Sequence, residues 1–160
     1  MRHTLPILAI LLLAAAPAPA PVPATGTPIV LAARPGTPLD ASARKLVATD
    51  LGEARAAREK PLVLTGSAML GTASDHPAVF VQLQSARECG SAGCSTTAFL
   101  WQKGVWKRIL DGVDGKLSVL PTKTRGMADI ASEKTRYVWN GTEYHDPKGA
   151  PPVDLRPRRK

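Results

Sequence analysis

The sequence contains few aromatic residues, and its body lacks a long apolar run. Only 4% of the 160 residues are Phe, Trp or Tyr, and beyond residue 20 no apolar stretch approaches the ~20 residues that a membrane-spanning helix needs. This excludes a transmembrane segment after residue 20. Because a typical domain takes ~100–150 residues, the length also argues against several domains and against an enzyme with a deep cofactor cleft.

The N-terminus has the pattern of a secretory signal peptide. Arg2 precedes an almost wholly apolar stretch at 5–16, and small residues and prolines follow it, an order typical of an export signal. We expect cleavage after Ala24, because the other possible site, four residues earlier, would leave a proline directly behind the cut. A retained anchor is the alternative. Removal of residues 1–24 lowers the formal charge from +8 to +7, and the chain is expected to be periplasmic or secreted.

Only two cysteines are present, Cys89 and Cys94, and they enclose Gly-Ser-Ala-Gly. In an oxidising compartment two such neighbours are expected to pair, and Gly90 and Gly93 can adopt the backbone angles of a tight ring. A redox role is less favoured, because four residues rather than two separate the cysteines. A metal site is also disfavoured, since two Cys with no His nearby fall short of four ligands. We therefore predict a structural disulfide, no metal and no cofactor.

The residues that can form a core are clustered in one part of the chain. All the aromatic residues and both cysteines fall within residues 80–144, whereas proline is concentrated in the flanks. We predict a signal peptide at 1–24, a linker at 25–36, a folded domain at 37–146 and a basic disordered tail at 147–160.

An amphipathic helix is predicted at the start of the domain, over residues 38–58. Thr37 can cap this helix, Pro38 suits its first position, and apolar residues then recur at steps of three and four. Gly52 is expected to weaken the middle of the helix and to bend it, and Pro61 is expected to end it.

The rest of the domain predicts antiparallel strands joined by short turns. The β-prone stretches are 62–64, 79–84, 96–101, 105–110, 117–120, 135–139 and 142–145. Gln102-Lys103-Gly104 predicts a three-residue hairpin loop, Asn140-Gly141 predicts a two-residue one, and residues 111–115 predict a turn. The expected fold class is α+β, with one helix packed on an antiparallel meander of about five to seven strands.

No catalytic constellation emerges from the sequence. No serine lies in a G-x-S-x-G motif, and the two histidines after the signal, His76 and His145, each stand beside an aspartate in a turn-like stretch. Nothing holds a carboxylate in the apolar pocket that acid–base catalysis needs. The candidate carboxylates fall at predicted turns or strand ends: Asp111, Asp114, Asp129, Glu133 and Glu143. A small hydrolase that uses one of the histidines stays as a third hypothesis.

Positive charge is the clearest functional signal. The formal charge of +7 that remains after removal of residues 1–24 favours anionic partners. Part of the charge belongs to the tail at 156–160, and part to Lys103, Lys107 and Arg108, which lie among the aromatic residues. Strand alternation places Trp106 and Arg108 on one face and Lys107 on the other. Nucleic acid is not expected as a partner, because an exported protein rarely meets it.

Three short pieces within residues 79–145 resemble small exported proteins of Gram-negative bacteria. The pieces are the Cys89–Cys94 turn with Phe99-Leu100-Trp101 behind it, Gly104-Val105-Trp106 with the basic residues that follow, and Trp139-Asn140-Gly141-Thr142-Glu143-Tyr144. The resemblance implies export and carries over no catalytic residue.

The leading hypothesis is a non-enzymatic binding domain whose partner is an envelope protein or an anionic polymer. A protein inhibitor of a cell-wall hydrolase is one concrete version, because a disulfide-closed loop is preordered and loses little entropy on binding. Contact residues are expected at Ser91 and Ala92 on the loop tip, with Trp101 and Trp106 as aromatic anchors and Arg108 as a further binding residue. The alternative is an envelope-associated anion binder that uses the basic tail.

Overall fold

The computed structural model describes residues 25–71, 77–91, 93–133 and 135–149, and within them it has two helices and eleven strands. The helices are α1 (Pro38–Leu46) and α2 (Ala48–Ala56). The strands, in chain order, are β1 (Thr27–Pro28), β2 (Leu62–Ala68), β3 (Ala78–Gln84), β4 (Cys89–Gly90), β5 (Gly93–Cys94), β6 (Thr96–Gln102), β7 (Val105–Val113), β8 (Ser118–Thr124), β9 (Met127–Ala131), β10 (Arg136–Trp139) and β11 (Tyr144–His145). The expected α+β class is confirmed.

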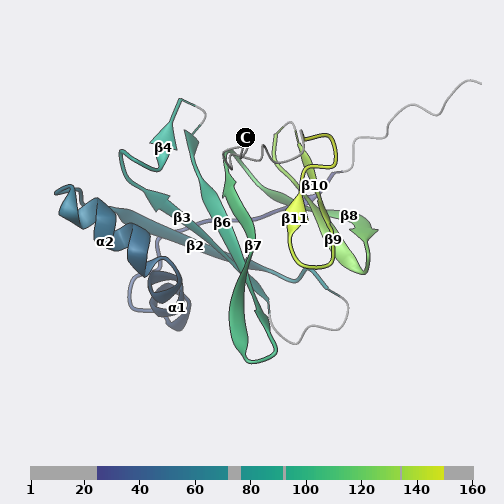
Figure 1. The fold of residues 1–160 in the computed structure, drawn as a ribbon, viewed down its shortest axis with the longest axis horizontal. Helices are drawn as coiled ribbons and strands as arrows, with labels where there is room; N and C mark the ends of the chain where they lie inside the picture. The colour runs from purple at the N-terminus through teal and green to yellow at the C-terminus, as the bar shows by residue number, and fades with distance from the viewer. Residues whose placement is uncertain (1–24, 72–76, 92, 134, 150–160) are drawn as a thin grey trace, which may run out of the picture.

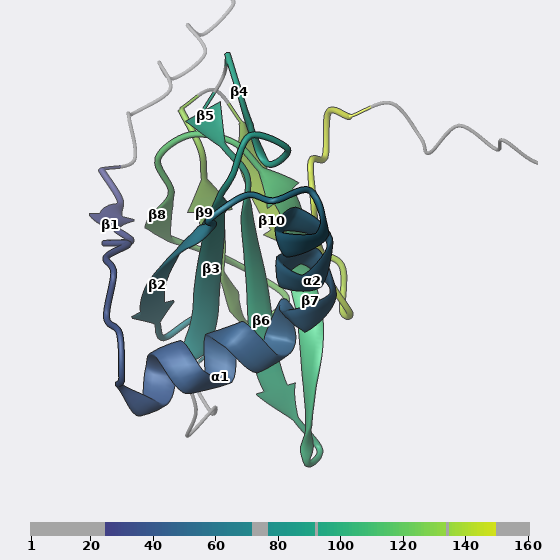
Figure 2. The same ribbon diagram turned by 90° about the vertical axis from the view of Figure 1, so that its left-hand side faces the viewer.

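The strands form two main antiparallel sheets instead of the single meander that we expected. One sheet has four strands in the order β2-β3-β6-β7, and the other has five in the order β1-β8-β9-β10-β11. The short pair β4–β5 forms a third, two-stranded sheet. Figures 1 and 2 show three layers, with the helices on one side of the four-stranded sheet and the five-stranded sheet on its other side.

The four-stranded sheet is buried on both faces, and this explains why there are two core clusters. Val79 and Val81 of β3 pack in one cluster with Leu51 of α2, whereas Phe80 packs in the cluster between the sheets and is fully buried. A strand covered on both faces needs apolar residues at successive positions, not only at alternate ones. The run from Ala78 to Val81 meets this requirement, and burial of one such large side chain contributes about 1.5–3 kcal/mol.

The helical segment changes direction at Val47, not at Gly52 as we expected. Val47 has φ −110° and ψ 27°, outside the helical range, so that α1 and α2 are separate helices. Its side chain is buried and packs in the same cluster as Leu51, whereas Gly52 is exposed. The bend therefore falls at a β-branched core residue with a weak helix preference. The predicted cap is confirmed, because Thr37 Oγ1 accepts a hydrogen bond from the Asp40 N–H at 3.2 Å.

Residues 25–36 belong to the fold, although we expected a linker. β1 pairs with β8 of the five-stranded sheet, and Ala32 forms a bridge with Thr65 of β2. Ile29, which lies between these two contacts in the chain, is buried in the cluster between the sheets. The segment thus connects an edge of one sheet to an edge of the other, and the folded region begins well before residue 37.

The turn between β6 and β7 has two residues, where we expected three. Gln102 pairs directly with Val105, so that only Lys103 and Gly104 remain between the strands. Their φ angles are 50° and 81°, as required in a type I′ turn, whose twist matches that of the flanking strands. Gly104 therefore takes the left-handed conformation that the sequence predicts.

The turn between β10 and β11 has four residues, where we expected two, since Trp139 pairs with Tyr144. Oδ1 of Asn140 accepts hydrogen bonds from the backbone N–H groups of Thr142 and Glu143 at 2.8 and 2.9 Å. An asparagine that bonds the backbone two residues ahead builds a turn by itself. The predicted hairpin is therefore present, but its connection is a four-residue turn held by the side chain of Asn140, not a two-residue loop.

Two parts of the sheets differ from the sequence prediction. β7 continues to Val113 through the expected turn at 111–115, because Gly112 adopts a φ of 59° where the pairing with β6 shifts register. Such a shift is a β-bulge, which keeps the strand paired past an extra residue. The sequence pattern also does not predict β9, because the charged Asp129 stands in the middle of its apolar residues. In the structure Asp129 is nevertheless fully buried.

Several predictions concern residues outside the described ranges. These are the signal peptide at 1–24, the tail from residue 150 onward, Ala92 and His76. Among the residues that the structure describes, no helix is long and apolar enough to cross a membrane.

Candidate functional site

The predicted disulfide is present and closes the β4–β5 hairpin. Cys89 pairs with Cys94 across the two strands, with an S–S distance of 2.04 Å. Gly93 has a φ of 108°, which side chains other than that of glycine rarely adopt. Nε2 of Gln82 in β3 donates to the carbonyl oxygen of Cys94 at 3.0 Å and ties the hairpin to the sheet. Ser91 is exposed on the turn.

The predicted aromatic anchors lie on the β6–β7 hairpin. Trp101 and Trp106 are directly paired, with their rings edge to face and the ring centres 5.4 Å apart. The guanidinium of Arg108 lies 5.7 Å from the centre of the Phe99 ring, within cation–π distance. Phe99 and Trp106 both pack in the cluster under the helices. Trp106 and Arg108 therefore share the helix-side face, as strand alternation predicts.

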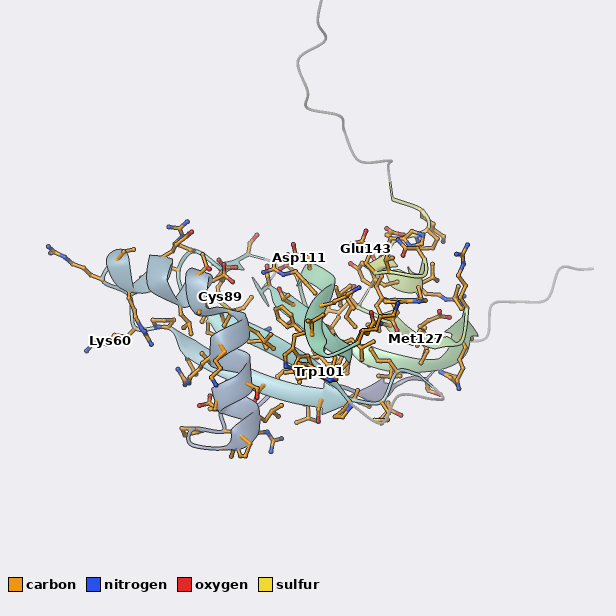
Figure 3. The ribbon with its side chains drawn as sticks, turned by 60° about the horizontal axis from the view of Figure 1, so that its bottom comes forward. Lys60, Cys89, Trp101, Asp111, Met127 and Glu143 are labelled. Carbon is orange, nitrogen blue, oxygen red and sulfur yellow. A yellow bond between two sulfur atoms is a disulfide. The ribbon has the colours of Figure 1, made fainter. Side chains whose placement is uncertain are left out.

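These predicted contact residues do not form one surface. Ser91 follows β4 at one end of β6, and Trp101 lies at the other end. Figures 1 and 2 show the β4–β5 hairpin and the β6–β7 turn at opposite ends of the molecule, and Figure 3 shows Cys89 and Trp101 at separate places. The stretch from Thr96 to Trp101 alone spans about 17 Å at ~3.3 Å per residue. We therefore distinguish a disulfide end, at β4–β5, from a hairpin end, at the β6–β7 turn.

A cleft with a volume of about 540 Å³ opens beside the disulfide hairpin. We call it the disulfide cleft. Its walls come from β2, β3, β5, the N-terminal segment and the connections between β7 and β8 and between β9 and β10. The lining residues that matter chemically are Leu31, Leu64, Gln82, Gln84, Lys116 and Glu133. The sequence did not indicate this cleft, because its residues meet only when the N-terminal segment closes against β2.

Two neighbouring carboxamides form one wall of the disulfide cleft. Nε2 of Gln84 donates to Oε1 of Gln82 at 3.2 Å, and Nε2 of Gln82 donates in turn to the Cys94 carbonyl and to Oγ1 of Thr96. These bonds fix the orientation of both amides. A carboxamide can donate and accept hydrogen bonds, so this wall suits a ligand that presents both N–H and C=O groups.

A buried carboxylate in the five-stranded sheet was not expected from the sequence. Asp129 of β9 is 0% exposed, and its Oδ2 accepts a hydrogen bond from Arg136 of β10 at 2.6 Å. Burial raises the pKa of Asp129, but the nearby hydroxyls of Thr122 and Thr124 in β8 and the charged, hydrogen-bonded Arg136 outweigh burial and hold the pKa below its usual value. A carboxyl group held ionised is a poor general acid. Asp129 therefore links β8, β9 and β10 as a structural charge.

The hydroxyl of Tyr144, like the carboxylate of Asp129, forms a hydrogen bond that joins two strands. It donates to the carbonyl oxygen of Ala128 at 2.7 Å inside the core. Burial, together with the nearby charge of Asp129, raises the pKa of Tyr144 far above its ordinary value. This phenol therefore stays protonated and connects β11 to β9.

The described residues gather no metal-binding cluster. His145 is exposed on β11, where it pairs with Val138. Within the described ranges, no three His, Cys, Asp or Glu side chains lie close enough to share a metal ion. The hydrolase hypothesis rests on His76 as much as on His145 and stays a prediction.

Comparisons with protein-family models, with curated proteins and with solved structures find no match. The function is therefore inferred from the residues of the chain and from their geometry.

Proposed function

We propose that the chain is a non-enzymatic binding domain, exported to the periplasm or beyond, that holds an extended segment of an envelope protein in the disulfide cleft. An inhibitor that places its disulfide hairpin against a cell-wall hydrolase is the specific form that we favour. The observation that carries the proposal is a cleft of about 540 Å³ directly beside a covalently closed hairpin.

The chemistry of the disulfide cleft suits a peptide backbone. An extended peptide presents alternating N–H and C=O groups. The remaining N–H of Gln84 can donate to a peptide carbonyl oxygen, and the carboxamide oxygens of Gln82 and Gln84 can accept from peptide N–H groups. Leu31 and Leu64 add apolar surface for the side chains of such a peptide, and burial of that surface favours binding. The nearby charged residues Lys116 and Glu133 are both exposed, so they can select partner side chains at the entrance.

The wall beside the hairpin is ordered before any partner arrives. The disulfide closes β4 onto β5, and Gln82 bonds both the Cys94 carbonyl and Oγ1 of Thr96, the latter at 3.2 Å. Because these groups are already fixed, binding would not have to order them. Ser91 on the adjoining turn is exposed and free to contact the same partner.

Site-specific photo-cross-linking in an envelope extract tests the proposal. A benzophenone amino acid in place of Lys116, beside the cleft, and one in place of Ser91 should both cross-link to the same envelope protein. The same amino acid in place of Arg55, on the exposed side of α2, is the control and should not capture that protein.

Blocking variants make the test decisive. Gln84→Trp fills the cleft and Ser91→Arg places a large cation on the turn, so both should abolish the cross-link from Lys116 without lowering the unfolding temperature. Arg55→Trp, which adds the same side chain on α2, should leave the cross-link unchanged. A Gln84→Trp variant that folds and cross-links as strongly as the wild type would show that the cleft does not hold the partner.

A second candidate function is an envelope-associated anion binder that uses the basic tail at 154–160. The formal charge of +8, to which Arg156, Arg158, Arg159 and Lys160 contribute, favours it. Binding to anionic vesicles should then fall steeply with salt and vanish when residues 154–160 are deleted. A flat salt response would remove this candidate.

A further inference from the structure

An exposed apolar residue adjoins the β6–β7 turn, at the far end of the molecule from the disulfide cleft. Figures 1 and 2 show this turn extending past α1 and past the rest of the sheet. Val105, the first residue of β7, is 52% exposed. Met69, which follows β2 at the same end of the sheet, is 54% exposed. Two of the most exposed large apolar side chains of the described residues thus lie at one end.

Lysines flank the exposed Val105. Lys103 stands in the turn and Lys107 two positions after Val105, and both are exposed. Among the described residues, neither lysine forms an ion pair, whereas Arg108 pairs with Asp111 at 3.0 Å. Because strand side chains alternate, Val105 and Lys107 share the face opposite Trp106. An exposed apolar side chain therefore lies between two cations that no described carboxylate neutralises.

The hairpin behind the turn is rigid. The type I′ geometry of Lys103 and Gly104 fits the twist of the strands. Trp101 and Trp106 form a cross-strand pair next to the Gln102–Val105 pair that closes the turn, and their rings are in contact. Both indoles are partly exposed, and tryptophan is enriched where an apolar phase meets water, because its ring is apolar and its N–H is polar. A rigid turn of this kind can enter an interface without first having to be ordered.

We infer that the hairpin end docks on an anionic lipid surface. The turn and Val105 enter the headgroup layer, and Lys103 and Lys107 contact lipid phosphates. Each cation beside such a surface gains attraction, while the lysine stems lie along the apolar phase. An acidic protein partner would attract the lysines, but it would not account for an exposed Val105 between them beside the turn. This inference goes beyond the proposed function, because the disulfide cleft lies at the other end of β6.

Vesicle co-sedimentation tests the inference on the chain from Thr25 to Lys160, which contains every described element. The vesicles are phosphatidylglycerol and phosphatidylcholine in a 3:7 ratio, with pure phosphatidylcholine as the neutral surface. Val105→Asp should weaken binding to the anionic vesicles at least tenfold. Lys103→Glu with Lys107→Glu should weaken it about twentyfold or more, since each lysine near an anionic surface contributes about fivefold.

Matched controls change the same side chains elsewhere. Val30→Asp alters an apolar residue that is 68% exposed at the N-terminal segment, and Lys45→Glu with Lys60→Glu reverses two exposed charges on α1 and after α2. Both controls should bind within about twofold of the wild type. Brominated lipids should quench the fluorescence of the wild type, because Trp101 and Trp106 lie just behind the inserted turn.

Two results would overturn the inference. In the first, Val105→Asp and the double lysine variant bind the anionic vesicles as strongly as the wild type, and binding is lost only when residues 154–160 are deleted. The tail would then be the lipid-binding part. The other is equal binding of the wild type to neutral and anionic vesicles. Since neither readout depends on cross-linking from Lys116, failure here leaves the proposed cleft function separately testable.

Discussion

Replacing Asp129 with asparagine tests whether one buried charge holds three strands of the five-stranded sheet together. Asparagine keeps the shape of the side chain but removes the charge that faces Arg136, Thr122 and Thr124. Arg136 is 52% exposed, so its charge can turn to water, and the cost stays below the ~3–5 kcal/mol of breaking a fully buried pair. Since a hydrogen bond to a charged group is worth about 1.5–3 kcal/mol, we expect a loss of about 2–3 kcal/mol at pH 7.

The loss should depend on pH in a defined direction. Because the folded protein lowers the pKa of Asp129, the carboxylate stabilises the fold fully above its unfolded pKa of ~3.9. This contribution disappears as the pH falls through the lower, folded-state pKa. The difference in unfolding free energy between the wild type and Asp129→Asn should therefore be largest above about pH 5 and shrink in more acidic solution.

Urea unfolding followed by tryptophan fluorescence measures this difference, since the buried Trp139 of β10 and the two tryptophans of the β6–β7 hairpin all report on the folded state. Asp111→Asn is the control, because Asp111 also pairs with an arginine, at 3.0 Å, but both partners are exposed. An exposed pair contributes at most about 1 kcal/mol. The reasoning is refuted if Asp129→Asn costs no more than Asp111→Asn, or if its cost at pH 3 equals its cost at pH 7.

Three further predictions concern other parts of the fold. Cys89→Ser with Cys94→Ser opens a short loop and should cost about 2 kcal/mol in urea unfolding, while alkylation of the unreduced wild type should add no mass; two alkyl groups would refute the pairing. Gly66→Ala should lower the unfolding temperature, because its methyl carbon would lie 2.7 Å from the backbone carbonyl oxygen of Val30. Gly52→Ala faces open space in α2 and should stabilise the fold by about 0.5–1 kcal/mol. Equal unfolding temperatures for the two variants would contradict this reasoning. Thr37→Ala removes the cap of α1 and should cost about 1 kcal/mol, with a loss of helical circular dichroism expected if α1 frays.

Much of the local structure follows from short stretches of the sequence. The cap at Thr37, the strand pair around Lys103-Gly104 and the disulfide turn each depend on residues within a few positions of one another. Their geometry is set by backbone angles and side-chain hydrogen bonds that neighbouring residues supply. For this reason the α+β class, the antiparallel pairing and the disulfide were all predictable.

The arrangement of the sheets was not predictable in the same way. Alternation within a strand shows which side chains share a face but not which sheet covers that face. β3 is apolar on both faces, and only the structure shows that Phe80 faces the second sheet and Val79 the helices. The burial of Ile29 likewise depends on contacts with strands about ninety residues later in the chain.

The candidate sites divide along the same line. Ser91 and the paired tryptophans were found from the sequence, because a disulfide turn and an aromatic hairpin are local patterns. The disulfide turn and the tryptophan pair are nevertheless separated, because β6 is extended and runs from one to the other. The disulfide cleft was missed, and Asp129 was expected at a turn or strand end rather than buried inside β9, because each of these features combines residues from several segments.

The sequence by itself therefore determined the elements of this protein: where most strands turn, which cysteines pair, and which residues are apolar enough to be buried. The tertiary structure alone decided how these elements are shared between two sheets, that the segment from Thr27 to Ala32 joins them, and which surfaces remain open. The physical reason is that turns and caps are stabilised by groups a few residues apart. Burial depends instead on which distant surfaces meet, and local pattern does not encode that choice.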